Sequence, residues 1–355
     1  NFRIDGQELE IRQSDPYNRG LLWSQRFAVT LCGERDSVLR VNMTDTLVRI
    51  QLPFVPSLVL PNTDGRGYGL FVPDESALKW LLAHWWEVKD DTARQSLLMT
   101  LYENYLAKHI SADDWTNSLL AGLPAEKNAL VASTVSGYLA GAEVEARVYA
   151  ISRNHPLPSC RVQLLRYFMQ NATSQPMVKE LYALWQEQSD KRLNQQDYTT
   201  LAYELAIRLP AESEQILRTQ RARIDDPDRL RQFDFISRAV VSDTARLDTL
   251  FNSLLVAENR RIEPWTAAVI RYLNHPLREE QSVKYIRPGL EVLEEVQRTG
   301  DIFFPKNWAS ALLGNHLSRP AYEEVVRFLD AHPDYSPLLK NKILQAAYSL
   351  YREND

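Results

Sequence analysis

The sequence predicts a mainly α-helical protein, in which a small N-terminal antiparallel β-sandwich precedes a large superhelical array of helix pairs. Two observations support this fold class. Before Asp74, short apolar runs with turn residues between them often alternate with a period of two, which is typical of strands. After Asp74 the apolar residues recur with a period of about 3.6, which is typical of helices. We therefore expect two domains, residues 1–73 and 74–355.

The composition limits the classes of function. The 355 residues carry a net charge of −5, whereas a nucleic-acid-binding domain needs a concentrated basic face. No apolar run reaches the roughly eighteen residues that a membrane-spanning helix needs. We therefore expect neither nucleic acid nor a membrane as a partner, while a cytoplasmic and a periplasmic location both stay open. Because the chain starts at Asn1 in a strand-like segment without an initiator methionine, we expect it to be a piece of a longer polypeptide.

Five strand-like segments are expected in residues 1–73, which suits a small sandwich of antiparallel sheets. The last of them is a hairpin made of two apolar runs with a turn between them. The expected segments are Phe2–Ile11, Leu21–Leu31, Ser37–Met43, Thr46–Leu52 and the hairpin Leu58–Val72.

The turn of this hairpin contains a G-x-G-x-G pattern. A dinucleotide site needs a helix after such glycines, but here a strand-like Leu-Phe-Val run follows. The pattern therefore favours a structural joint between the two domains, in which the glycines adopt turn conformations. We expect the tyrosine of this turn to pack or hydrogen-bond where the sandwich meets the helices. The predicted hinge residues are Asn62, Gly65, Gly67, Tyr68 and Gly69.

Short loops separate the helical segments after Asp74. Asp74 or Ser76 is the expected cap of the first helix, which runs to Trp86, and Ser111 followed by acidic residues predicts another helix start. Because one core cannot cover so many helices, a stack of helix pairs fits better than a bundle. The other expected helices are 92–106, 126–148, 159–170, 175–187, 195–208, 211–223, 227–240, 243–257, 263–273, 279–299, 305–317, 320–331 and 337–352.

A short motif recurs between helices. Residues 154–157, Asn-His-Pro-Leu, recur as residues 274–277, and residues 331–334 are similar. The proline blocks continuation of the preceding helix, so the histidine lies near the carbonyl end of that helix. We therefore interpret these three histidines, His155, His275 and His332, as helix-end residues and not as metal ligands.

The sequence contains no familiar catalytic or metal-binding motif. H-E-x-x-H, G-x-S-x-G and G-x-x-x-x-G-K-[ST] are all absent, so we assign no catalytic, metal-binding or cofactor-binding residue. A cluster of arginines allows two interpretations. It forms either a salt-bridged turn with nearby aspartates, or an inward-facing site where one arginine receives a carboxylate. The cluster consists of Arg218, Arg221, Arg223, Arg229 and Arg231.

Several segments resemble the last two domains of M1-family zinc aminopeptidases, most of all bacterial ones. They are the hinge, Asn62–Gly69 with Asp74 after it, then Asp228–Ser237, and finally Phe303–Trp308 continuing through Lys342–Ala347. In that family a small β-sandwich follows the catalytic domain, and a helical domain with HEAT- or armadillo-like pairs follows the sandwich. The order and size of the domains match over nearly the whole chain.

The resemblance implies that the chain is the non-catalytic C-terminal region of a metallo-aminopeptidase, an enzyme that removes N-terminal residues from peptides. The family's zinc motif, H-E-x-x-H, and its G-x-M-E-N motif have no counterpart here, so zinc would bind upstream and this chain alone would be inactive. The expected partners are the upstream catalytic domain and peptide substrates. The helical bowl would close over the active site and control peptide access.

Two other functions stay open. The first is a stand-alone α-solenoid module that binds a protein or peptide and has no enzymatic parent. The second is a self-contained hydrolase whose site is assembled from scattered residues.

Overall fold

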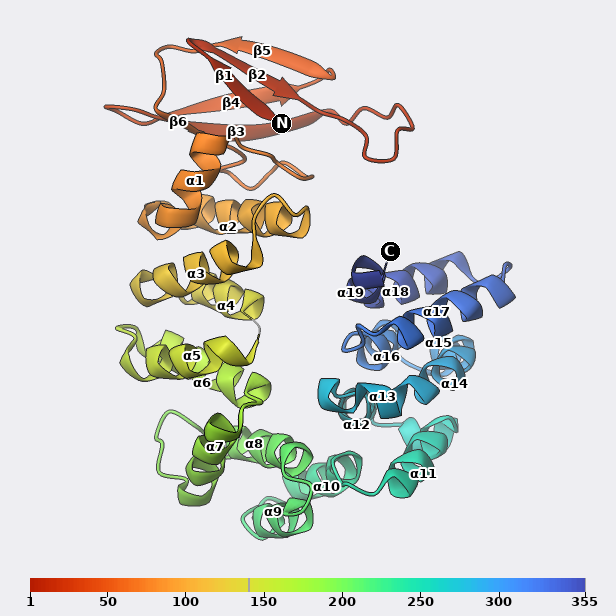
Figure 1. The fold of residues 1–355 in the computed structure, drawn as a ribbon. Coiled ribbons are helices and arrows are strands. Elements are labelled where there is room, and N and C mark those ends of the chain that lie inside the picture. The colour runs from red at the N-terminus through yellow and green to blue at the C-terminus, as the bar shows by residue number, and fades with distance from the viewer. Residues whose placement is uncertain (140, 355) are drawn as a thin grey trace. The chain divides into compact units, whose positions relative to one another are not determined.

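The computed structural model describes residues 1–139 and 141–354, and it is mainly α-helical with a small antiparallel β part at the N-terminus (Figure 1). The predicted fold class is thereby confirmed. The change from strand to helix occurs at Asp74, which caps the first helix. The chain divides by compactness into two units, Asn1–Met177 and Val178–Asp355, so the strands share a unit with the first helices. Each unit is described by itself below.

The β part of unit 1 consists of two three-stranded antiparallel sheets. One sheet has the order β1-β2-β5 and the other has the order β4-β3-β6. Alternate side chains of both sheets, such as Leu9 of β2 and Val29 of β3, are fully buried in one shared core. The strands are β1 (Phe2–Asp5), β2 (Glu8–Arg12), β3 (Gln25–Cys32), β4 (Ser37–Met43), β5 (Leu47–Gln51) and β6 (Leu58–Leu60).

Three of the strand predictions are wrong in extent. The segment 2–11 forms two strands, because Gly6 turns the chain with a φ of 59°. The strand predicted from Leu21 begins at Gln25, since the residues before it belong to a loop. The hairpin has no second arm, because residues 67–74 are irregular and β6 pairs with β3 instead.

The helical part begins in unit 1 directly after the β part. Asp74 caps the first helix by accepting a hydrogen bond from the Ala77 N–H, and Ser111 caps a later one by accepting from the Asp114 N–H, as predicted. The helices are α1 (Glu75–His84), α2 (Asp91–Leu106), α3 (Ala112–Gly122), α4 (Ala129–Tyr138), α5 (Ala142–Asn154), α6 (Pro158–Asn171) and α7 (Gln175–Glu187), which crosses into unit 2.

The rest of unit 2 consists of helices and the loops between them, with no strand among the described residues. Its helices are α8 (Gln195–Arg208), α9 (Ser213–Arg221), α10 (Pro227–Ile236), α11 (Thr244–Leu254), α12 (Glu263–Leu273), α13 (Glu279–Ser282), α14 (Ile286–Glu291), α15 (Leu293–Thr299), α16 (Phe304–Leu313), α17 (Arg319–Ala331), α18 (Pro337–Ala346) and α19 (Tyr348–Asn354).

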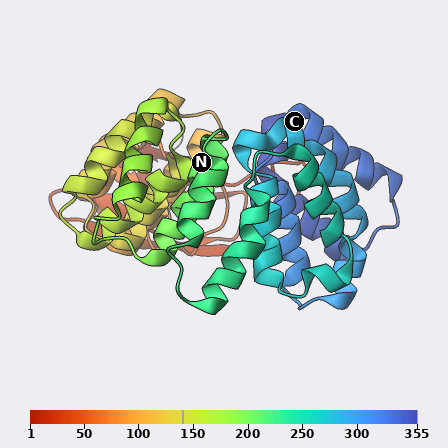
Figure 2. The ribbon, with the colours of Figure 1, turned by 90° about the horizontal axis from the view of Figure 1, so that it is seen from below.

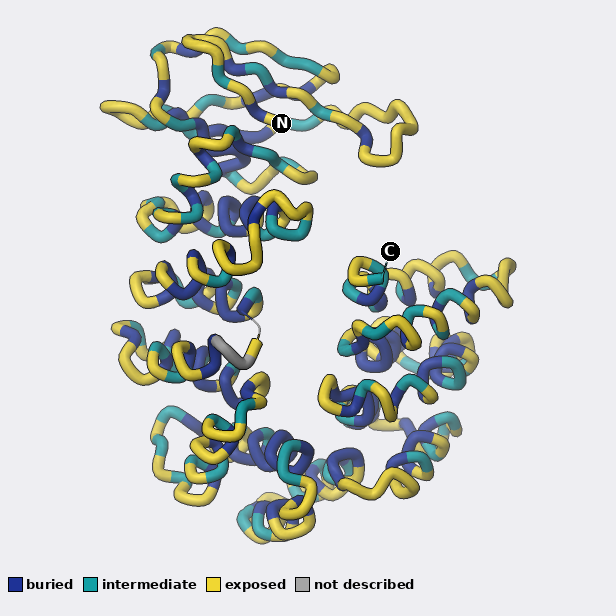
Figure 3. The backbone as a smooth tube through the Cα atoms, viewed as in Figure 1, coloured by how far each residue is buried: buried dark blue, intermediate teal, exposed yellow. Residues whose placement is uncertain are grey.

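The helices of each unit stack in rows. In unit 1, α2, α4 and α6 contact one another in succession, and α1 contacts α3. In unit 2, α10, α12, α16 and α18 form one row, and α14, α17 and α19 form another (Figure 1, Figure 2). Buried segments lie inside each stack, whereas the loops are mostly exposed (Figure 3). None of the described helices is long and apolar enough to span a bilayer.

Two of the long helices predicted from the sequence are interrupted. The segment 126–148 divides into α4 and α5 at Gly141, whose φ of 101° lies outside the helical region. The segment 279–299 divides into α13, α14 and α15, and Pro288 lies within this run. In contrast, α7, α8 and α12 have the predicted bounds.

The recurring Asn-His-Pro-Leu motif has the same structure at both of its positions. The Nδ1 atoms of His155 and His275 accept hydrogen bonds from the backbone N–H two residues later, at 3.1 and 3.2 Å. The Nε2 atom of His155 lies 3.0 Å from the Leu123 carbonyl oxygen, and that of His275 lies 3.3 Å from Glu204 Oε2. Each histidine therefore ties a helix end to an earlier helix. The related His332 instead places its Nδ1 2.7 Å from the Phe328 carbonyl oxygen.

Candidate functional site

The predicted hinge residues form a turn that is tied to both the β part and α2. Asn62, at a φ of 49°, holds both sides of Gly67: its Oδ1 accepts from the Gly67 N–H at 2.7 Å, and its Nδ2 donates to the Gly67 carbonyl at 3.2 Å. The Ser96 hydroxyl of α2 donates to the Asn62 carbonyl at 2.5 Å. The Ala28 N–H of β3 donates to Asp64 at 3.0 Å. The turn therefore links β3 to the second helix.

Glycine is favoured at the three positions of this turn for different structural reasons. Gly65 and Gly69 have φ angles of 66° and 135°, which other residues rarely adopt. Gly67 instead lacks space, because an added Cβ would lie 2.4 Å from the Phe71 ring. Tyr68 does not pack as predicted. Its side chain is 90% exposed, while its backbone N–H donates to Gln25 Oε1 at 2.7 Å.

Replacing Gly67 with valine should lower the free energy of unfolding of unit 1 by about 1–3 kcal/mol, because the added side chain overpacks the turn against Phe71. Urea unfolding followed by circular dichroism measures the change. The matched control is Gly137→Val in α4, where an added Cβ meets no atom within 4 Å, and we expect a change of no more than about 1 kcal/mol there. Equal stabilities of the Gly67 and Gly137 variants would contradict the role of the turn as a joint.

A groove of about 1020 Å³ opens on the β part beside this turn. Its floor includes the buried core residues Phe2, Ile11 and Phe27, and its walls come largely from the loop after β2 and the segment 66–72. The walls carry large apolar side chains that are at least 40% exposed, namely Tyr17, Leu22, Trp23, Tyr68 and Leu70. Such a cluster of exposed apolar groups is typical of an interaction surface.

The loop that forms one wall is held in place by hydrogen bonds. The side chain of Gln13 closes it, because its Oε1 accepts from the Trp23 N–H at 3.2 Å while its Nε2 donates to the Trp23 and Asp45 carbonyls. Asp15 accepts from the backbone N–H groups of Tyr17 and Arg19 and from the Arg19 guanidinium. The Arg19 hydrogen bond lowers the pKa of Asp15 to about 2. The exposed apolar side chains therefore stand on an ordered loop.

The charged side chains that line the groove are basic. Among the described residues, its lining contains no aspartate or glutamate. Three of its four arginines have an acidic partner outside the lining, whereas Arg26 forms no side-chain hydrogen bond or ion pair with the described residues. The arginines are Arg12, Arg19, Arg26 and Arg66.

The arginine cluster of unit 2 contains the ion pairs of the first predicted arrangement. Arg221 pairs with Asp234 at 2.7 Å, and Arg231 pairs with Asp228. Arg223 donates to the Trp185 carbonyl at 3.0 Å and lies over its ring. Most of the cluster is therefore occupied by internal contacts.

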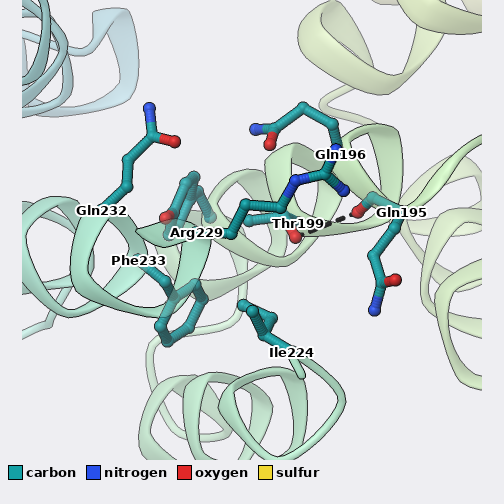
Figure 4. A pocket seen from close by; sticks show the side chains of 8 residues that line it. Gln195, Gln196, Thr199, Ile224, Arg229, Gln232 and Phe233 are labelled. Atoms are coloured by element: carbon teal, nitrogen blue, oxygen red, sulfur yellow. Dashed lines mark hydrogen bonds between the residues drawn. The ribbon is translucent and has the colours of Figure 1, made fainter. Parts of the chain in front are cut away.

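Arg229 is the member of the cluster whose guanidinium has no hydrogen bond or ion pair with the described residues, and it is exposed. Figure 4 shows it alongside Thr199 and Gln196, at a crevice that Gln232 and Phe233 also line. The crevice itself holds about 10 Å³, roughly enough for one water molecule. A ligand would therefore bind over its mouth, where the guanidinium and two side-chain amides offer hydrogen-bond donors.

The histidines do not gather into a metal site. Among residues 1–139 and 141–354, no group of three or more His, Cys, Asp or Glu side chains is placed to hold a metal ion. His316, for example, is buried with Nε2 2.9 Å from Asn274 Oδ1 and Nδ1 3.6 Å from Glu279 Oε1. The described residues therefore do not fit a zinc ion, and we derive no chemical step through one.

No protein-family model matches the sequence, and the comparison with curated proteins finds no match. The assignment of function consequently depends on the features of the chain itself. Sequence reasoning singled out the hinge and the arginine cluster. It did not find the groove, because residues far apart in the sequence form its walls and only the fold brings them together.

Proposed function

We propose that this chain is the non-catalytic C-terminal region of a zinc aminopeptidase that removes N-terminal residues from peptides. The observation that carries the proposal is the groove on the β part, which offers a docking surface for the catalytic domain. The sequence resemblance to M1-family aminopeptidases supplies the identity of that partner. In the proposal the helical part closes over the active site of the catalytic domain and controls access of peptides.

The properties of the groove suit a permanent contact with another domain. Its exposed aromatic side chains, Tyr17, Trp23 and Tyr68, are of the type that contributes most to the energy of protein interfaces. The wall loop is already ordered, so less conformational entropy is lost on docking. The unpartnered Arg26 and the absence of acidic lining residues in the described structure favour a partner surface that is apolar with carboxylates at its edge.

The zinc ion of the proposal belongs to the catalytic domain, where it supplies Lewis-acid chemistry for peptide hydrolysis. This chain contributes binding only. Arg229, with Gln196 and Gln232 beside it, is the group that we propose for holding a carboxylate at the far end of a longer peptide, because a guanidinium binds carboxylates with two parallel hydrogen bonds.

Reading the coding sequence upstream of Asn1 gives the first test of this proposal. We expect the same reading frame to encode H-E-x-x-H, a later glutamate and G-x-M-E-N in the several hundred residues before this chain. A complete upstream frame without these motifs would overturn the proposal. The alternative would then be a stand-alone helical module that binds a protein or peptide.

A further inference from the structure

The edge of β3 that faces away from β4 is only partly occupied. β6 pairs with residues 30–32 of this strand and with none before them. The turn after β6 then satisfies Ala28, whose carbonyl oxygen accepts from the Thr63 N–H at 2.9 Å and whose N–H donates to Asp64 at 3.0 Å. The part of this edge that precedes Ala28 has no neighbouring strand among the described residues.

Arg26 presents its backbone to this open part of the edge. Along a strand, successive residues point their N–H and C=O groups alternately to the two sides. Because β3 and β4 pair without a bulge and Ala28 points both groups away from β4, Arg26, two residues earlier, does the same. Neither group of Arg26 has a hydrogen-bond partner among the described residues on that side. The edge therefore offers one free donor and one free acceptor.

These free backbone groups belong to a residue that lines the groove of unit 1. Arg26 lines it together with Phe27 of the same strand and with residues 68–72. Phe27 is 4% exposed and forms part of the apolar floor, whereas the Arg26 side chain is exposed on the opposite face of the strand. A strand added here would point alternate side chains toward the apolar floor and place the others beside Arg26.

Arg26 also carries the excess positive charge of the groove lining. The other three lining arginines each pair with an acidic side chain next to the groove, whereas Arg26 has no such partner among the described residues. A single carboxylate is therefore the charge that complements the lining, and it should stand directly opposite Arg26. The residues before and after that carboxylate would face the floor, so they should be apolar.

We propose that the catalytic domain docks through an extended segment that adds to β3 as an antiparallel strand. In this arrangement one residue of the segment, an aspartate or a glutamate, exchanges both backbone hydrogen bonds with Arg26. Its two neighbours are large and apolar and lie on the floor of the groove. Backbone bonds then supply affinity, and alternate side chains supply specificity. The inference rests on the proposed function for the identity of the domain that carries the segment, whereas the mode of binding uses residues of unit 1 alone.

Titration calorimetry of the whole chain with a synthetic peptide tests this mode of binding. The probe is a short peptide with blocked ends, in which a central glutamate has a leucine on each side and the other residues are serine and threonine. We expect saturable binding with a Kd below about 1 mM. Arg26→Glu should weaken binding about tenfold or more, because the carboxylate then meets a like charge. The control is Arg35→Glu, at an exposed arginine of the turn between β3 and β4, and it should bind as the wild type does.

Two methylated probes distinguish strand addition from other kinds of binding. A methyl group on the backbone nitrogen of the glutamate removes the donor to the Arg26 carbonyl oxygen, so this probe should bind about tenfold more weakly or worse. The same methyl group on the nitrogen of the following leucine points away from β3, so that probe should bind like the parent peptide. The two probes have the same side chains and the same charge.

Amide hydrogen exchange locates the new hydrogen bond. In the chain labelled with isotopic nitrogen at arginine, saturating probe should slow exchange of the Arg26 amide at least about fivefold. Arg40 of β4 is the matched control, because it lies opposite Ala28 and its N–H likewise points away from the paired strand. Exchange of the Arg40 amide should not change.

Three results would overturn the proposal. The first is no saturable binding of the parent probe up to about millimolar concentration. The second is equal weakening by the two methylated probes. The third is unchanged exchange of the Arg26 amide when the probe is bound. None of these results bears on the zinc motifs expected upstream, and an upstream frame without those motifs would overturn the proposed function but not the addition of a strand to β3.

Discussion

Replacing Arg94 with methionine should lower the free energy of unfolding of unit 1 by about 3–5 kcal/mol. Arg94 of α2 is 4% exposed, and its Nε and Nη2 donate to the two carboxylate oxygens of Glu126 at 2.7 and 2.8 Å. Glu126 is 1% exposed and also accepts the N–H groups of Lys127 and Asn128. Without the arginine, a buried carboxylate loses its counter-charge, and the helix rows of unit 1 lose a link.

An exposed arginine–carboxylate pair provides the control for this variant. Arg221 and Asp234 form the same two-bond arrangement at 2.7 and 2.9 Å, but their side chains are 53% and 44% exposed. Because solvent screens exposed pairs, Arg221→Met should lower the free energy of unfolding far less than Arg94→Met does. Urea unfolding of both variants gives the two free energies. Similar losses of unfolding free energy for Arg94→Met and Arg221→Met would show that burial does not determine how much each ion pair stabilises the protein.

Acidification should lower the free energy of unfolding in two stages, and the first stage depends on His316. Burial lowers the pKa of His316 below its usual value near 6.5, so the folded chain keeps this ring neutral while the unfolded chain takes up a proton. The stability from this group is present above about pH 6.5 and is lost as the pH falls below that value, at up to about 1.4 kcal/mol per pH unit. His316→Gln should remove this loss.

The second stage depends on carboxylates that are buried or half-buried. Burial alone would raise the pKa values of Glu145, Glu204 and Glu279, but hydrogen bonds and neighbouring charges outweigh it and the net pKa of each lies below the usual range. Thr173 and Ser174 hold Glu145, Arg208 and His275 hold Glu204, and two backbone N–H groups hold Glu279. Their stabilisation is present above about pH 4.5 and is lost below it.

Melting temperatures of the wild type and His316→Gln between neutral pH and about pH 3.5 separate the two stages. The wild type should lose stability already near pH 6, whereas the variant should hold its melting temperature until the carboxylates begin to protonate. Parallel curves for the two proteins over the whole range would show that His316 is not the group that titrates first.

The sequence predicted best those helices whose ends have their own local signals. Helix α8 has the predicted bounds because Asn194 and Asp197 form a reciprocal cap at its start. The prediction of one long helix at 126–148 failed at Gly141. Helical periodicity continues on both sides of this residue, and the sequence does not show that its φ is positive. The prediction of a second hairpin arm failed for a similar reason. The apolar run at 70–72 looks like a strand, but in the described structure it is irregular and is joined to β1 by the hydrogen bond from the Phe2 N–H to the Val72 carbonyl at 3.0 Å.

The candidate sites were harder to predict from the sequence than the helices, because tertiary structure brings their residues together. The sequence pointed to five arginines in one cluster, but only the fold shows that Arg221 and Arg231 are paired while Arg229 is free of side-chain partners among the described residues. The groove brings together residues on both sides of β3, such as Trp23 and Tyr68, which no local pattern connects. The hinge turn was found because glycine and asparagine signal turns locally.

The most direct test of the proposed function is the intact mass and metal content of the native polypeptide, isolated from its source with an antibody against this chain. The account predicts a polypeptide longer than these 355 residues that carries one zinc ion and hydrolyses aminoacyl-p-nitroanilides. Substituting aspartate for Trp23 in that whole protein should reduce this activity or release the C-terminal region to proteolysis. A native polypeptide of 355 residues without zinc and without aminopeptidase activity would contradict the account.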